Sequence, residues 1–277
     1  MLRTGAMRVH LAVALTFAGA HAASAEPRFH RLTPQLAARL APKARSGLAS
    51  VVELRDASGF LVHADAGSGR ALLLTNEHVT RGGLASPEPV HFFDGAVAQA
   101  RRVLHANASL DYSLVEIELP AGRAVTPLAL EPAGLRAGRP IYTIAAYANL
   151  TGPGALGGGP AATAAVQNGP ANQFAIATGA VDGQSAGTVW VNTGKGRILG
   201  VLSHLPNSPG MSGSPVLARD THAVLGLHSA GTATPAPWTE TSIPIALILQ
   251  DVAAQLRGGA FDAAARPLVE GLLRATP

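Results

Sequence analysis

Residues 207–215 read NSPGMSGSP, and this stretch decides how the rest of the chain is interpreted. It holds Ser212 between two glycines and two prolines, which predicts a fixed, glycine-hinged turn rather than a flexible linker. A serine hydroxyl is a weak nucleophile at neutral pH unless a base and an orienting carboxylate activate it. The turn therefore indicates a catalytic serine only if the chain also supplies a histidine and an acid.

Two upstream segments supply these groups. Residues 73–79, LLTNEHV, place His78 at the end of an apolar run, and residues 109–115, SLDYSLV, place Asp111 at the start of another. The order along the chain is thus His, Asp, Ser. With these three local contexts the sequence resembles the chymotrypsin-like (trypsin-fold) serine peptidases. Within that superfamily it is most similar to cysteine-free bacterial members, namely the glutamyl endopeptidases and the HtrA-type protease domains.

The resemblance implies a role for each residue. Ser212 is the expected nucleophile, His78 the base that takes its proton, and Asp111 the group that orients the imidazole. The backbone N–H groups of Gly210 and Ser212 are implied to form the oxyanion hole. Taken singly, His78 reads as a structural histidine near a strand end and Asp111 as a turn residue. Their joint occurrence, in this order and setting, favours a catalytic triad.

Two hypotheses concern the substrate. Residues 225–231, LGLHSAG, resemble the strand that lines the specificity pocket, and His228 matches the histidine that receives the substrate carboxylate in glutamyl endopeptidases. One hypothesis is therefore cleavage after Glu. The other is a wall or core histidine in a small neutral pocket. The residues implied to bind substrate are His228, Ser229, Ala230, Gly231 and Asn207.

Three further points concern the same pocket. The resemblance implies that Ser229 also helps to hold the triad aspartate. Met211 stands where the animal digestive enzymes carry the aspartate that pairs with a newly cut N-terminus, so activation by that ion pair is not expected. Counting back from Ser212, the base of the pocket falls at Pro206 or its neighbours, which include no acid, and a preference for Lys or Arg is not expected.

Composition restricts the class of protein. The chain has 277 residues, 47% of them hydrophobic, with 31 glycines, 20 prolines and no cysteine. This profile predicts a globular all-β protein of short strands and tight turns, without disulfides or thiol chemistry. Residues 1–25 read as a secretory signal peptide, with Arg3 and Arg8 ahead of an apolar stretch. Their removal lowers the formal charge from +4 to +2, which does not suggest a nucleic-acid partner.

The expected fold class is all-β: two antiparallel six-stranded barrels of the trypsin-like type with a C-terminal α-helix. The apolar runs are short and separated by turn residues, as such barrels require. Residues 151–165 contain almost only Gly, Ala, Pro and Thr and predict an exposed loop. The expected segments are a signal peptide at 1–25, an N-terminal extension at 26–46, a first barrel at 47–122, a second barrel with its helix at 123–257, and a tail at 258–277.

Two other functions are suggested by parts of the sequence. Residues 183–187, GQSAG, match the nucleophile elbow of esterases around Ser185, but that elbow leads into a helix whereas residues 188–191, TVWV, predict a strand. A secreted binding module on the same scaffold is the other rival, and the complete set of His78, Asp111 and Ser212 argues against it. The sequence thus predicts a secreted or periplasmic, monomeric serine endopeptidase acting on polypeptides. It predicts no cofactor, no metal site, no nucleic-acid partner and no permanent membrane span.

Overall fold

The computed structural model describes residues 28–84, 87–146, 174–181, 189–193, 196–205, 210–231 and 240–277. Five of the sequence-based predictions concern residues outside these ranges and stay predictions: the signal peptide at 1–25, the loop at 151–165, Ser185, Pro206 and Asn207.

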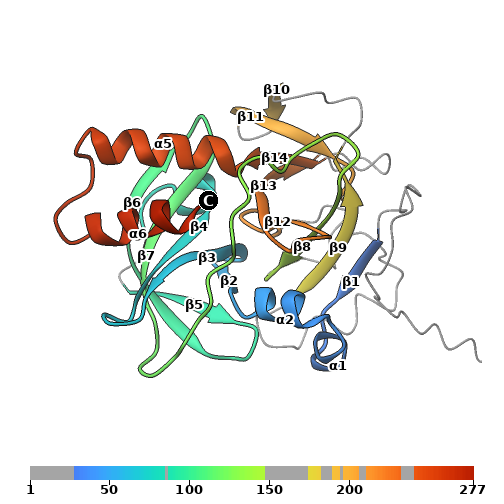
Figure 1. Ribbon diagram of the computed structural model, residues 1–277, viewed down its shortest axis with the longest axis horizontal. Helices are drawn as coiled ribbons and strands as arrows, with labels where there is room; N and C mark the ends of the chain where they lie inside the picture. The colour runs from blue at the N-terminus through green and yellow to red at the C-terminus, as the bar shows by residue number, and fades with distance from the viewer. Residues whose placement is uncertain are drawn as a thin grey trace, which may run out of the picture.

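Six antiparallel strands close into a first barrel in the order β2-β3-β4-β7-β6-β5 (Figure 1). They are β2 (Val51–Leu54), β3 (Ala57–Asp65), β4 (Arg70–Thr75), β5 (Glu88–Phe92), β6 (Val97–Asn107) and β7 (Tyr112–Glu118). Alternate side chains of a strand point to the same face, so every second apolar residue can enter the barrel. Val52, Leu54, Leu73 and Val115 are buried together in this way and fill its interior.

Eight strands form a second sheet in the order β1-β9-β8-β12-β13-β14-β11-β10. They are β1 (Arg28–Arg31), β8 (Pro140–Ala145), β9 (Ala175–Ala180), β10 (Val189–Thr193), β11 (Gly196–Ser203), β12 (Pro215–Ala218), β13 (Val224–Gly231) and β14 (Glu240–Pro244). An isolated antiparallel bridge between Val181 and Ser203 joins the ends of β9 and β11. The six strands from β9 to β11 in this order therefore curl toward a second barrel, and β1 and β10 are additional edge strands.

The expected fold class is thus confirmed, with one addition at the N-terminus. Strand β1 comes from the segment expected to be an N-terminal extension, and it pairs antiparallel with β9 over four residues. The two short helices that follow, α1 (Pro34–Ala38) and α2 (Pro42–Leu48), each begin with a proline in the first turn. Proline is suited to that position because its missing N–H has no partner there in any case.

Two helices close the chain. Helix α5 (Ile245–Arg257) follows β14 directly, as the sequence predicted, and helix α6 (Arg266–Ala275) lies within the segment expected to be a tail. The apolar face of α6 packs against the first barrel so closely that a Cβ at Gly271 would lie 2.3 Å from His63 Nε2. The loop before α6 is tied to the same barrel by an ion pair between Arg102 and Asp262.

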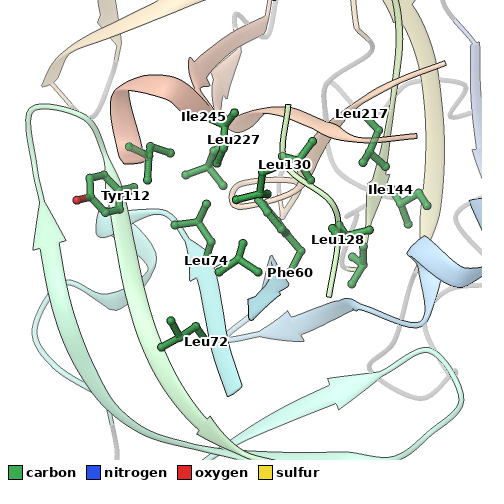
Figure 2. Close-up of a cluster of buried hydrophobic side chains, with 14 of the residues drawn as sticks. Phe60, Leu72, Leu74, Tyr112, Leu128, Leu130, Ile144, Leu217, Leu227 and Ile245 are labelled. Atoms are coloured by element: carbon green, nitrogen blue, oxygen red, sulfur yellow. The ribbon is translucent and has the colours of Figure 1, made fainter. Parts of the chain in front are cut away.

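The two halves share one large core. Figure 2 shows Phe60 and Leu74 of the first barrel in one cluster of buried side chains with Leu217 and Leu227 of the second sheet. Fully burying a side chain of this size contributes about 1.5–3 kcal/mol relative to leaving it exposed. Because this core lies between the halves, it fixes how they face each other and hence how residues from both meet in one site.

Candidate active site

His78 is presented by a single helical turn at the end of β4. The strand ends at Thr75, Asn76 is extended, and α3 (Glu77–Thr80) begins immediately after it. The Nδ2 of buried Asn76 donates to the backbone carbonyl of Asp111 at 2.8 Å. A second contact, between the hydroxyls of Thr80 and Ser113 at 2.6 Å, holds the turn against β7. These contacts bring the histidine segment and the aspartate segment together.

The His78 imidazole lies against the Asp111 carboxylate. Its Nδ1 is 2.9 Å from both Oδ1 and Oδ2, and the backbone N–H of His78 donates to Oδ1 at 3.1 Å. Asp111 adopts a positive φ of 43°, which is uncommon outside glycine. With the Nδ1 proton directed at the carboxylate, Nε2 is the ring nitrogen left to act as a base.

Ser229 connects this pair to the nucleophile candidate. Its hydroxyl donates to Asp111 Oδ2, and its backbone carbonyl oxygen lies 3.4 Å from the Oγ of Ser212. Ser229 itself is buried. One residue of β13 therefore touches both Asp111 from the first barrel and Ser212 from the second sheet, and the predicted site residues lie where the two halves meet.

The loop that carries Ser212 rests on the first barrel through Ser58. The backbone N–H of Ser58 donates to the carbonyl oxygen of Ser212 at 2.8 Å, and its Oγ donates to that of Gly210 at 3.2 Å. Gly213 has a φ of 84°, and a Cβ there would lie 1.9 Å from the carbonyl oxygen of Ser58. The sequence contains no signal for Ser58, because its role arises only when strands from both halves are packed together.

Strand β13 holds the same loop from the other side. The N–H of Gly213 donates to the His228 carbonyl at 3.0 Å, and the N–H of His228 donates to the Ser214 carbonyl at 2.9 Å. The Met211 side chain is fully buried in a small apolar cluster. Carbonyl groups of the loop thus accept hydrogen bonds from Ser58 on one side and from His228 on the other. The N–H groups of Gly210 and Ser212 remain the predicted oxyanion donors.

Asp251 of α5 anchors the strand that follows Asp111. It accepts hydrogen bonds from Tyr112 Oη at 2.6 Å, Asn107 Nδ2 at 2.9 Å and His105 Nε2 at 3.0 Å. Burial by itself would raise the pKa of Asp251, but the hydrogen bonds from Tyr112, Asn107 and His105 lower it to about 2. Helix α5 therefore carries a carboxylate, that of Asp251, which holds both strands flanking the turn of Asp111.

Comparison with known proteins identifies the family of this chain. The model of the trypsin-like peptidase domain matches residues 57–227, which is more than half of the chain. The chain belongs to the trypsin-like peptidase family. No curated protein sequence matches it significantly. Its structural relatives include a serine endoprotease from Yersinia pestis and the HtrA-type protease AlgW in complex with a decapeptide.

The likeness to these two proteins is one of fold. The Yersinia protease has a TM-score of 0.52 and 16% identity, over 78% of this chain and 66% of that protein. AlgW has a TM-score of 0.50 and 19% identity, over 73% of this chain and 52% of that protein. This trypsin-like peptidase thus corresponds to about two thirds of one relative and about half of the other.

The residues predicted to bind substrate in this trypsin-like peptidase lie along one strand. His228, Ser229, Ala230 and Gly231 all belong to β13, whereas Asn207 lies outside the described residues. The side chain of His228 is only 1% exposed, and its Nδ1 lies 2.7 Å from Glu240 Oε1.

Sequence reasoning missed Glu240. In the sequence, the residues at the base of the pocket are counted back from Ser212, and none of them is acidic. Glu240 instead begins β14, a later strand whose Ser242 pairs with His228 in the register of the sheet. An isolated Glu before an apolar helix gave no signal of its own. Among the described residues, no three His, Asp or Glu side chains are grouped so that they could hold a metal ion.

Proposed function

We propose that this trypsin-like peptidase is a serine endopeptidase that cleaves polypeptides through an acyl-enzyme. The proposal is carried by one observation: His78 Nδ1 contacts both oxygens of Asp111 at 2.9 Å, and Ser229 links that carboxylate to Ser212. A partly exposed imidazole with a carboxylate on Nδ1 is prepared to accept a proton on Nε2. Serine nearby is the residue type that such a base activates.

In the proposed reaction Ser212 Oγ attacks the peptide carbonyl and transfers its proton to His78. The negative charge that develops on the carbonyl oxygen is stabilised by the N–H groups of Gly210 and Ser212. Protonated His78 then gives the proton to the departing amine as the C–N bond breaks. Water repeats the sequence on the acyl-enzyme, which releases the acid and regenerates the serine. Asp111 stays ionised throughout and stabilises the imidazolium.

An active-serine phosphonate tests this proposal directly. Wild-type protein is expected to form one covalent adduct on Ser212, and Ser212→Ala and His78→Ala are expected to lose hydrolysis by about 10⁴–10⁶-fold. Ser185→Ala is the matched control and keeps full activity. If the folded wild-type protein forms no adduct, the binding-module alternative is favoured. If Ser185→Ala abolishes activity and Ser212→Ala does not, the esterase alternative is favoured.

We also propose that the protein is exported and acts as a monomer outside the cytoplasm. The proposal rests on the signal-like residues 1–25. Among the described residues, no helix is both long and apolar enough to cross a membrane. Mass spectrometry of the processed protein tests the export proposal, with a new N-terminus at Glu26 as the expected result. An N-terminus that retains residues 1–25 would refute it, and light scattering of the purified protein tests the monomer.

A preference for Glu before the cut is a finer prediction that depends on His228. That histidine would have to present its imidazole to the substrate carboxylate. The imidazole of His228 already lies against the carboxylate of Glu240, a residue of the same chain. The alternative from the sequence, a core histidine beside a neutral pocket, agrees better with its 1% exposure.

A further inference from the structure

A buried polar cluster lies beside the proposed active site and has no part in the triad. Its members are Ser203 of β11, His228 of β13, and Glu240 and Ser242 of β14, all of them at most 1% exposed. The carboxylate is at the centre. Glu240 Oε2 accepts from Ser203 Oγ at 2.9 Å, Oε1 accepts from Ser242 Oγ at 2.9 Å, and His228 Nδ1 lies 2.7 Å from Oε1.

The cluster is connected to the candidate active site through His228. His228 directly precedes Ser229, and its own backbone exchanges hydrogen bonds with the two residues that follow Ser212, Gly213 and Ser214. The imidazole that it carries is thus attached to the same strand segment that orients the nucleophile. By the family resemblance, this strand segment also lines the pocket for the side chain before the scissile bond.

Buried charges are stable only when they are paired and hydrogen-bonded. Glu240 satisfies this requirement internally, because two hydroxyl groups donate to its two oxygens and the His228 imidazole lies 2.7 Å from Oε1. A substrate carboxylate that approached His228 would meet a second carboxylate sharing the same imidazole. Like charges brought together in a buried site repel each other strongly, so an acidic side chain is disfavoured there.

We propose that Glu240 is a specificity-determining residue: it occupies the place on His228 that an acidic substrate side chain would need. The substrates are then polypeptides with a non-acidic residue before the scissile bond. This inference rests on the proposed function, since it concerns the pocket of the same site. It also implies that His228 does not receive a substrate carboxylate, because a residue of the chain itself already lies against its imidazole.

The test compares two peptides that differ only in Gln or Glu before the cut. Their flanking residues are taken from a cleavage site mapped by mass spectrometry in a denatured protein. Gln and Glu have nearly the same shape, so the ratio of their kcat/KM values isolates the charge. The wild-type protein is expected to prefer Gln by at least about tenfold, which corresponds to 1.4 kcal/mol or more. A wild-type preference for Glu overturns the proposal without any variant.

Variants then locate the effect. Glu240→Gln frees His228 and is expected to shift the ratio toward Glu by about tenfold or more. In the double variant Glu240→Gln with His228→Gln the shift is expected to disappear. Ser203→Ala is the matched control, because it removes a hydrogen-bond partner of Glu240 but keeps the charge, and it is expected to retain the wild-type ratio. An unchanged ratio in a Glu240→Gln protein that still labels with phosphonate overturns the proposal.

The two proposals fail in different ways. A protein that forms the Ser212 adduct and cleaves the Gln peptide, but does not discriminate against Glu, refutes only the role of Glu240. A folded wild-type protein that neither labels nor cleaves any peptide refutes the endopeptidase proposal, and the role of Glu240 with it.

Discussion

Replacing Gly213 with alanine should separate the nucleophile from the first barrel. A Cβ at this position would lie 1.9 Å from the Ser58 carbonyl oxygen and 2.5 Å from Thr75 Oγ1. Neither atom can move easily, because Thr75 Oγ1 donates to that same carbonyl at 2.7 Å inside the closed barrel. The loop that carries Ser212 must therefore shift instead.

The size of the effect follows from these distances. An ordinary van der Waals contact is about 3.5 Å, so the loop has to move by about 1.6 Å. A misplacement of about 1 Å in a catalytic group costs on the order of 100-fold in rate. The left-handed backbone conformation of alanine costs about 1–2 kcal/mol in addition, and overpacking typically adds about 1–3 kcal/mol. We therefore expect at least about a 100-fold loss of peptide hydrolysis.

Gly95→Ala is the matched control. Gly95 has a nearly identical φ of 86°, but a Cβ there meets no atom within 4 Å. It should show the backbone cost alone, a loss of about 1–2 kcal/mol in stability with normal activity. Thermal unfolding measures the stability of both variants, and the rates of phosphonate labelling and peptide cleavage measure the site. If Gly213→Ala and Gly95→Ala labelled and cleaved at the same rate, the reasoning from contact distances would be refuted.

Three further predictions concern charged groups. Ser229→Ala removes a hydroxyl that donates to Asp111. Because hydrogen bonds to charged groups contribute about 1.5–3 kcal/mol, this variant should lower kcat by roughly tenfold or more. An unchanged kcat would refute this prediction. Burial, with a smaller contribution from Asp56, raises the pKa of Glu53 from 4.5 to about 7. As the pH rises, the unfolded chain loses the Glu53 proton before the folded protein does. The free energy of unfolding should therefore fall between about pH 4.5 and 7. Thermal melts of Glu53→Gln should lack this pH dependence. The pKa of Asp251 is lowered to about 2 in the folded protein. Its contribution to the free energy of unfolding is therefore present above 3.8, the pKa in the unfolded chain, and is lost as the pH falls toward 2. The difference in Tm between wild type and Asp251→Asn should accordingly shrink from pH 5 to pH 2, and a constant difference would contradict it.

The fold and the pair of His78 with Asp111 could be predicted because their signals are local. An apolar run that ends in His78 and another that begins after Asp111 are each visible within seven residues. Their order along the chain then carried the family resemblance. The roles assigned to these residues in the reaction stay predictions until the labelling experiment is done.

Other contacts could not be predicted because they join distant strands. Ser58 and Ser212 are separated by most of the chain, and the ion pair of His228 with Glu240 depends on the register between β13 and β14. A missed local signal also exists. Helix α6 begins with Pro267 in its first turn and buries Leu268 and Leu272 four residues apart, which is a helical pattern short enough to be read as a tail.

The C-terminal helices have a consequence for how the protein unfolds. Helix α5 contacts β13 and β14 of the second sheet, while α6 rests on β3 and β4 of the first barrel. The two helices also contact each other, the loop between them is anchored by Arg102 and Asp262, and Asp251 of α5 accepts hydrogen bonds from β6 and β7 of the first barrel. Neither half can therefore open without pulling a helix from the other, so the two barrels should melt cooperatively in a single transition rather than one after the other.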